Sequence, residues 1–440
     1  MRSARPVALT LGLLLAAGAA VPGWTAEDRP DSADDPFAEF DAEEWDDPWA
    51  TRAGGLTWTG FVEGAAGARW TDVDNLDRLS LGELRLRVET GYAWRAFQFD
   101  FKGDLVLDQA VEDFDAELRE LATTFRPGQR VDVKLGRQVL TWGTGDLLFL
   151  NDLFPKDFIS FFAGRDEDYL KSPSDTARVS IFTAAANIDL AWTPRFSPDG
   201  YLYGERFAFW DPVLGDVAAP ADPRRADEPD SGELALRLFR TAGATEYALY
   251  GYAGRWKQPL GSGVDGEPLF PRLRTWGASV RAPLHRGIFN AEAAWYDSRD
   301  DRSGDDPAVP NSELRMLLGY EQELVRNLTA GTQLYAERIQ GHDRLLAGAP
   351  DPQHARDEWR TVATLRLTWR ALRDTLTSSL FVFVSPSDED YYLRPSIAWR
   401  RDDHWLLAAG LNLFGGRYDH TFFGQLEDDS NGWLRLRYFY

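Results

Sequence analysis

The chain has 440 residues, of which 44% are hydrophobic and none is cysteine, and it carries a formal net charge of −22. The absence of cysteine excludes a lipidated N-terminus and a disulfide framework, and the strong negative charge argues against nucleic-acid binding. After the first segment, no stretch approaches the ~20 consecutive apolar residues that a membrane-spanning helix requires.

Residues 1–26 have the pattern of a secretory signal peptide. Arg2 and Arg5 form a positive start, Val7 to Val21 form an apolar core, and small residues follow up to Ala26, where cleavage is expected. The apolar run is short for a membrane span, so a retained N-terminal anchor is the less favoured alternative. The sequence therefore predicts export from the cytoplasm.

Residues 27–54 are rich in acidic residues and proline and poor in apolar residues. This composition favours a disordered segment, which after export would form an acidic periplasmic tail. A solvated spacer is the favoured interpretation. A role in binding a periplasmic partner stays open because the segment contains four aromatic residues: Phe37, Phe40, Trp45 and Trp49.

From residue 55 to residue 440, apolar residues alternate with polar ones. Leu84 and Leu86, for example, are interleaved with Arg85 and Arg87. A period of two indicates strands that have one apolar and one polar face. A β-sandwich would show the same alternation, so the connections between strands must decide between the two folds.

Eighteen segments carry this pattern, and 16 is the alternative count because two of the shorter segments are weak. They lie near 56–70, 79–91, 95–107, 116–126, 129–141, 176–184, 187–194, 233–241, 244–256, 272–283, 287–297, 312–323, 327–339, 357–370, 374–385, 390–400, 404–415 and 431–440. Tight turns, such as 126–129, alternate with long polar connections, such as 195–232. Short periplasmic turns and longer extracellular loops are the signature of a transmembrane barrel. The predicted fold is an all-β, antiparallel transmembrane β-barrel over 55–440.

Tryptophans near the predicted strand ends support this fold, because aromatic rings favour the two headgroup levels of a bilayer. They are Trp94, Trp369, Trp399 and Trp405 beside short turns, and Trp142, Trp256 and Trp359 near long loops. The last strand places Leu434, Leu436, Tyr438 and Tyr440 on one face. An aromatic end of this kind resembles the signal read by the barrel-assembly machinery, and the resemblance implies that machinery as a partner. The expected surroundings are outer-membrane lipid and lipopolysaccharide.

A barrel of 16 to 18 strands is too wide for its side chains to fill, so its inward-facing residues should line a lumen. Closure brings the last strand beside the first, which places the pore-lining arginines on one wall: Arg85, Arg87, Arg360, Arg366, Arg394, Arg400, Arg435 and Arg437. The other inward faces carry acids: Asp100, Asp104, Asp132, Glu246, Glu292, Glu313, Glu321 and Glu337. Two opposed walls would orient dipolar solutes and favour anions. The alternative, given equal weight, is that these charges pair across strands and only solvate the interior.

The third long connection, residues 142–175, is apolar where the others are polar. The ten Leu, Ile and Phe residues within 147–162 would form an aggregation-prone patch in water, so we expect the loop to fold inward and narrow the lumen. The residues assigned to this constriction are Asp146, Asp152, Asp157, Phe149, Phe154 and Phe158, with the three aspartates facing the arginines. The alternative is a structural plug that makes no contact with solutes.

The segment LGRQVLTWGTGDLLFLNDLFPKDF, residues 135–158, resembles a motif of porin-like outer-membrane β-barrels of Gram-negative bacteria, a largely uncharacterised family. The resemblance covers the barrel, is densest over Leu135 to Ser174, and does not include the acidic tail. It implies an outer-membrane location and a transport-like role. Some members of this family are suspected companions of inner-membrane exporters.

No catalytic constellation emerges from the residues. The five histidines lie at turns or in long connections, and none is placed beside a serine or a paired carboxylate at triad spacing. The glycines of WGTGD lack the lysine of a phosphate loop, and the aspartates of 297–306 match no known cation-binding loop. We therefore expect no enzyme, no metal and no cofactor. The favoured function is a channel for small anionic or amphipathic solutes. The alternatives are the outer-membrane component of an export system with a periplasmic or inner-membrane partner, and a structural barrel with a sealed lumen.

Overall fold

The computed structural model describes residues 56–212, 214–263, 266–349 and 351–440, so the expected signal peptide (1–26) and acidic tail (27–54) lie outside the described residues. Eighteen long strands dominate it: β1 (Thr57–Arg69), β2 (Leu79–Trp94), β3 (Phe97–Asp108), β4 (Asp113–Gly128), β5 (Val131–Val139), β6 (Pro173–Ile181), β7 (Asn187–Thr193), β10 (Glu233–Ala242), β11 (Thr245–Arg255), β14 (Arg272–Leu284), β15 (Gly287–Ser298), β16 (Glu313–Val325), β17 (Leu328–Ile339), β18 (Trp359–Ala371), β19 (Leu376–Ser385), β20 (Asp390–Arg400), β21 (Trp405–Gly416) and β22 (Asn431–Phe439).

Shorter elements occupy the long connections between these strands. They are α1 (Phe158–Ala163), the 3₁₀ helix η1 (Glu167–Leu170), β8 (Phe209–Asp211), β9 (Asp216–Ala218), β12 (Gly261–Ser262), β13 (Pro268–Leu269), α2 (His342–Gly348) and the 3₁₀ helix η2 (Gly424–Asp429). Among the described residues, none of the helices is both long and apolar enough to cross a membrane.

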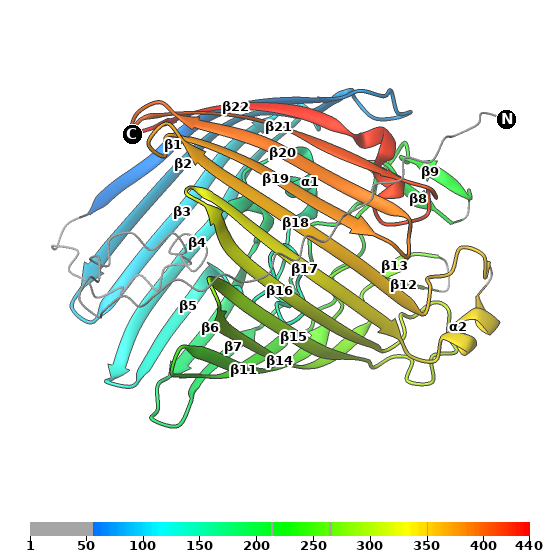
Figure 1. The fold of residues 1–440 in the computed structure, drawn as a ribbon, viewed down its shortest axis with the longest axis horizontal. Coiled ribbons are helices and arrows are strands. Elements are labelled where there is room, and N and C mark those ends of the chain that lie inside the picture. The colour runs from blue at the N-terminus through cyan, green and yellow to red at the C-terminus, as the bar shows by residue number, and fades with distance from the viewer. Residues whose placement is uncertain (1–55, 213, 264–265, 350) are drawn as a thin grey trace, which may run out of the picture. The chain divides into compact units, whose positions relative to one another are not determined.

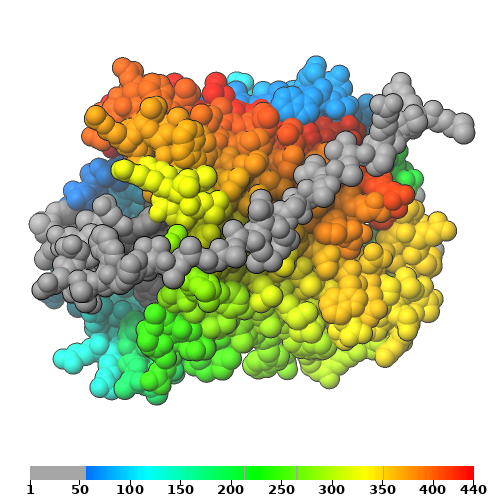
Figure 2. Space-filling model, viewed as in Figure 1, coloured from blue at the N-terminus to red at the C-terminus, as the bar shows by residue number. Residues whose placement is uncertain are grey.

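The 18 long strands form one closed antiparallel sheet. Each strand pairs with the next long strand along the chain, and β22 pairs back onto β1. Figure 1 shows the resulting ring of tilted strands, and in Figure 2 its visible wall follows chain order from green through yellow to orange. The predicted β-barrel is confirmed, with 18 strands rather than 16.

The seam between β1 and β22 closes the ring. Phe61 lies opposite Phe439 in the register, and the backbone N–H of Tyr440 donates to the carbonyl of Gly60 at 3.1 Å. The hydroxyl of Tyr440 reaches one strand further and donates to the carbonyl of Arg87 at 2.8 Å. Position 60 must be glycine, because a Cβ there would overlap the backbone carbonyl oxygen of Arg87 as well as the end of the Tyr440 side chain.

The outer surface of the barrel is apolar, since the outward residue of each strand is typically Leu, Val, Ile or an aromatic. Leu84 and Leu436, on β2 and β22, are about half exposed. Exposed tryptophans occur at both ends of the strands: Trp94, Trp369, Trp399 and Trp405 at the short-turn end, and Trp192, Trp276, Trp295 and Trp359 at the long-loop end. This is the lipid-facing band of a transmembrane barrel.

Two tryptophans assigned to this girdle face the lumen instead. Trp142 and Trp256 are 8% and 4% exposed, and their rings pack against Phe154 at 4.9 Å and Tyr296 at 5.5 Å. Both tryptophans come just after the end of a strand, β5 or β11. Alternation stops there, so the sequence pattern does not indicate whether such a side chain faces the lipid or the lumen.

Candidate functional site in the barrel lumen

The connection between β5 and β6, residues 140–172, packs against inward-facing residues of the strands. Leu150 and Phe162 are 1% and 2% exposed. The hydroxyl of Tyr296, on β15, donates to the carbonyl of Leu150 at 2.6 Å, and the ring of Phe162 meets that of Phe414, on β21, at 5.3 Å. The apolar side chains are thus removed from water. Burial of each Leu or Phe stabilises the folded state by about 1.5–3 kcal/mol. We call residues 140–172 the lumen loop, and Figure 1 shows its helix α1 inside the ring.

Helix α1 sets the path of the lumen loop. It starts at Asp157, whose carboxylate accepts from the backbone N–H of Ser160 at 2.9 Å, and this satisfies a donor that the first turn leaves unpaired. The helix ends at Gly164, which has a left-handed backbone with φ 89°. A side chain there would also overlap the ring of Trp433 on β22. Position 164 therefore requires glycine for two independent reasons.

The first anchor of the lumen loop is Glu292, an inward residue of β15. Its carboxylate accepts hydrogen bonds from the Thr144 hydroxyl at 2.9 Å, the Gly145 N–H at 3.0 Å and the Asn151 side chain at 2.7 Å, and it also accepts from the Thr144 N–H. Gly143 begins this turn with φ 91°, and a Cβ on it would press on the same carboxylate. The glycines of WGTGD therefore form a cradle around an acid of the barrel wall. Alternation along β15 predicts that Glu292 faces the lumen, but it does not predict this contact with the loop.

The second anchor lies at Arg366, an inward residue of β18. Its guanidinium pairs with Asp146 at 2.6 Å and with Glu167 at 3.0 Å. Arg394, on β20, also contacts Glu167, at 3.3 Å. Burial alone would raise the pKa of Glu167, but the charges of Arg366 and Arg394 outweigh it and lower this pKa to about 2. Asp146 therefore does meet the arginine wall, at Arg366.

Arg435 and Arg437, on β22, hold the next acid of the lumen loop. They contact Asp166 at 3.1 Å and 3.0 Å, and Arg437 also pairs with Glu63 of β1 at 2.7 Å. Burial favours a higher pKa for Asp166, whereas the two arginines lower it to about 2. Asp166 and Glu167 were not singled out from the sequence, although the polar run RDEDY directly follows the apolar part of the loop.

Arg85 and Arg87 contact the lumen loop through Tyr169. The Tyr169 hydroxyl accepts from Arg87 at 2.6 Å and donates to Asp104 at 2.9 Å, and Arg85 lies over its ring at 4.3 Å. Both arginines also pair with Asp104, each at 2.7 Å. Asp104 was expected on the opposing acidic wall. It is instead the neighbour of these arginines, because β2 and β3 are adjacent and Arg87 lies directly opposite Asp104 in the register.

Most other charges of the lumen also form local pairs. Glu313 and Glu337 contact Arg315 and Arg356 rather than facing distant arginines, and Glu246 pairs with Arg237. The expected field between two opposed walls is therefore replaced largely by pairs between adjacent strands and loops. Pairing across strands is the alternative that the sequence allows beside two opposed walls.

The remaining predicted site residues lie apart from the two anchors. Arg360 pairs with Asp388 at 2.6 Å, and Arg400 is exposed at the short-turn end, over the ring of Phe439 at 5.4 Å. The expectation that Asp152 and Asp157 face the arginines is wrong. Asp152 pairs with Lys156 at 2.9 Å, and Asp157 caps α1. Partners that are close in sequence take up both carboxylates.

The lumen loop crosses the barrel from side to side. β15, which carries Glu292, and β2, which carries Arg85 and Arg87, are nine strands apart in the ring of 18. They therefore lie on opposite walls, and the loop touches both. The contacts place the loop across the lumen, between the short-turn end and the long-loop end.

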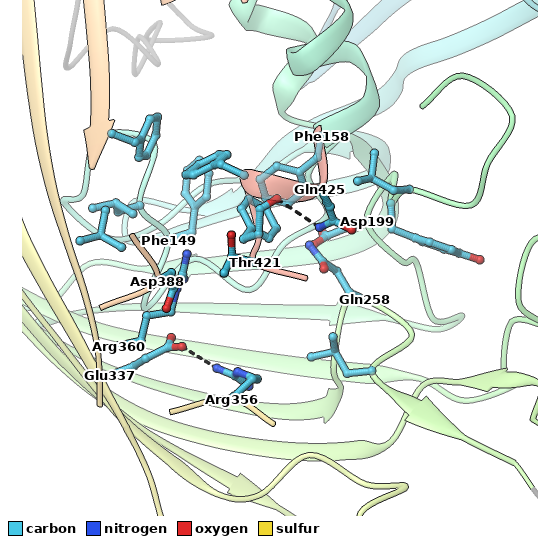
Figure 3. A pocket seen from close by; sticks show the side chains of 18 of the residues that line it. Phe149, Phe158, Asp199, Gln258, Glu337, Arg356, Arg360, Asp388, Thr421 and Gln425 are labelled. Atoms are coloured by element: carbon cyan, nitrogen blue, oxygen red, sulfur yellow. Dashed lines mark hydrogen bonds and ion pairs between the residues drawn. The ribbon is translucent and has the colours of Figure 1, made fainter. Parts of the chain in front are cut away.

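A cavity of about 990 Å³, here called the vestibule, opens on the long-loop side of the lumen loop. Figure 3 shows Phe149 and Phe158 of the lumen loop on its border, together with Arg356, Arg360 and Glu337 of the opposite side. Phe154 also lines it. The vestibule thus combines an apolar surface from the loop with a charged surface from the barrel wall. Among the described residues, no cluster of three or more His, Asp or Glu side chains is arranged to hold a metal ion.

Comparison with solved structures identifies the fold. The chain matches OccAB3 of Acinetobacter baumannii at 9% identity and a TM-score of 0.52, with 88% of this chain and 99% of that chain covered. It matches OccK5 of Pseudomonas aeruginosa at 12% identity and a TM-score of 0.51 (88% and 99% covered), and OccK2 of the same organism at 10% identity and 0.52 (88% and 97%). No protein-family model and no curated protein matches the sequence.

At these identities the likeness concerns the fold alone. The closed ring of 18 strands, the apolar outer band and the aromatic rows at its two ends agree with the same conclusion. The protein is therefore an outer-membrane β-barrel with a porin-like fold.

Proposed function

We propose that the protein is a passive outer-membrane channel for small solutes that are anionic or amphipathic. The observation that carries the proposal is the lumen loop, which spans the barrel beneath an open vestibule of about 990 Å³ and is attached to the wall by ion pairs. A barrel of this width is otherwise too wide for its side chains to fill.

The lining of the vestibule supports amphipathic solutes. Phe149 and Phe158 offer apolar surface, while Arg356 and Arg360 offer guanidinium groups across the same cavity (Figure 3). Ligand sites in proteins commonly combine a large apolar surface with a few placed polar groups. A solute with an aromatic ring and a carboxylate satisfies both surfaces.

The arginines that hold Asp166 and Glu167 support anionic solutes. Among the described residues, Arg394 and Arg435 each keep a buried Nε that has no hydrogen-bond partner. Arginine stays charged and can bind a carboxylate with two parallel hydrogen bonds. A solute carboxylate can therefore replace Asp166 or Glu167 on these arginines and move past the loop by exchanging ion pairs.

The test is electrical recording of the purified barrel in planar bilayers. We expect steady single-channel currents, a reversal potential in a salt gradient that favours anions, and stronger current block by benzoate than by acetate. A barrel that never conducts would be a sealed structural barrel, and a cation-selective current would contradict the assignment of the arginines. Equal block by benzoate and acetate would show that the apolar surface of Phe149 and Phe158 does not contribute to solute binding.

A further inference from the structure

Four arginines gather on the outside of the barrel, at the long-loop ends of β11, β14 and β15. Their outward direction follows from the register, which sets Arg255 opposite Arg272 and Arg274 opposite Asp297, on the same face as the pair Trp276 and Trp295. Arg272 and Arg274 are exposed. We call Arg255, Arg272, Arg274 and Arg299 the outer arginine cluster.

The cluster lies at the level of lipid headgroups. Trp276 and Trp295 are 62% and 38% exposed on the outer surface, and outward tryptophans mark the boundary between hydrocarbon and headgroups. Arg274 is two residues beyond Trp276, about 7 Å further along the strand at ~3.4 Å per residue. The long connections 256–271 and 299–312 leave the barrel at this end, which makes it the extracellular end.

The charge of the cluster is only partly compensated. Arg272 pairs with Asp300 at 2.5 Å, and Arg299 pairs with Asp297 at 2.8 Å. Asp297, which lies opposite Arg274 in the register, is thus paired with Arg299 instead. Among the described residues, no carboxylate pairs with Arg274.

The neighbouring groups leave this excess of positive charge in place. Arg255 donates to neutral groups, the Ser231 hydroxyl at 3.0 Å and the Phe270 carbonyl at 2.7 Å. The nearby Asp301 directs its carboxylate to backbone N–H groups of its own turn. Four guanidinium groups therefore face two carboxylates.

We propose that the outer arginine cluster binds the phosphate groups of a glycolipid of the outer leaflet. A guanidinium beside hydrocarbon is stabilised most by an anion that can accept two of its hydrogen bonds, and phosphate has this geometry. The adjacent tryptophans supply the apolar surface against which the acyl chains of such a lipid pack. Arg272 and Arg274 hold the headgroup. The cluster thereby attaches the long-loop end of the barrel to the leaflet that contains the phosphorylated lipid.

The experiment uses the full-length barrel purified in detergent and measures lipid binding by native mass spectrometry. The probes are diphosphoryl lipid A, the same lipid after removal of its phosphates, and inorganic phosphate as a competitor. We expect the phosphorylated lipid to bind at least tenfold more tightly than the dephosphorylated one. We expect millimolar inorganic phosphate to leave this binding unchanged, because it lacks the acyl chains.

Two variants locate the binding. The double variant Arg272→Gln with Arg274→Gln is expected to lose at least fivefold in affinity for the phosphorylated lipid. The matched control is Arg240→Gln, because Arg240 is exposed and outward at the opposite end of β10, and its affinity should equal that of the unchanged protein. Folding of each variant is checked by its heat-dependent gel mobility. Equal binding of the two lipids, or an equal loss in Arg240→Gln, would overturn the proposal.

Discussion

The two anchors of the lumen loop differ in chemistry. At the β15 wall, one barrel carboxylate, that of Glu292, accepts hydrogen bonds from the backbone and neutral side chains of the loop. Along the arginine-bearing strands β18, β20 and β22, loop carboxylates such as Asp166 pair with barrel arginines such as Arg435. An anionic solute is repelled by the charge of Glu292, whereas under the proposed function it replaces a loop carboxylate on an arginine. The comparison assigns a fixed end to Glu292 and an exchangeable end to the arginines.

Removing the loop between the anchors should have the largest effect. We expect deletion of residues 147–163 to raise single-channel conductance severalfold, because most of the apolar material crossing the lumen is lost. The control is deletion of residues 343–347 in α2, a helix with no buried residue, and it should leave conductance within the scatter of the unchanged protein. If the 147–163 deletion conducts no better than this control, the loop does not restrict the pore.

Reversing charge at the exchangeable end should change ion selectivity. In Arg394→Glu with Arg435→Glu, the added carboxylates join Asp166 and Glu167, each of which keeps only one arginine, Arg437 or Arg366. We expect the reversal potential to move towards that of a cation-selective pore. The matched control, Arg240→Glu with Arg401→Glu, alters two exposed arginines near the short turns. A similar shift in both variants would assign the selectivity to net charge alone.

Weakening the fixed end should have a smaller effect. Glu292→Gln keeps the size of the side chain but presents an amide to the N–H groups of Thr144 and Gly145, and hydrogen bonds to charged groups are worth about 1.5–3 kcal/mol each. We expect noisier open-channel current with less than a twofold change in its mean. The control is Glu246→Gln, which affects an ion pair with Arg237 away from the loop. Its open-channel current noise should equal that of the unchanged protein.

Acidification should have the smallest effect over most of its range. The pKa values of Asp166 and Glu167 are lowered to about 2 by their arginines, so their ion pairs are fully formed above the ordinary carboxyl pKa of about 4. These pairs are lost only as pH falls through about 2. We expect flat conductance from pH 8 to pH 4 and a rise below pH 3.

A conductance step near pH 6 would contradict that expectation and would point to another carboxyl. Burial raises the pKa of Asp199, which borders the vestibule, to about 6. Asp199→Asn separates the two sources, because it should abolish a step that originates there and leave the arginine pairs intact.

The strands could be predicted from sequence because lipid imposes the same rule on every one of them. Each outward residue must be apolar, so that Leu84 and Leu86 stand out against Arg85 and Arg87 without any knowledge of their partners. The inward-folded apolar loop follows from the same physics, since ten large apolar side chains cannot remain in water. Both inferences depend on single residues and their solvent, and not on pairing.

The contacts inside the lumen could not be predicted, because they depend on which parts of the chain meet. Asp152 and Asp157 lie in the loop that was expected to form the constriction. Their carboxylates are instead taken up by Lys156 and by the first turn of α1. Asp166 lies only nine residues after Asp157 and makes the contact that was expected there. Alternation places Glu292 in the lumen, but only the folded loop shows that WGTGD closes around it.

The seam between β1 and β22 has a consequence for how the barrel forms. Every other neighbouring pair joins strands that follow one another along the chain, whereas Phe61 and Phe439 pair across almost the whole described sequence. Contacts between distant parts of a chain form late, because a long loop must be closed first. Until the seam forms, β1 and β22 are open edges, and each unpaired backbone group in hydrocarbon costs several kcal/mol. A sheet of 18 strands without its seam is therefore not a slightly weaker barrel but an aggregation-prone intermediate, and entry into the membrane becomes an all-or-none step.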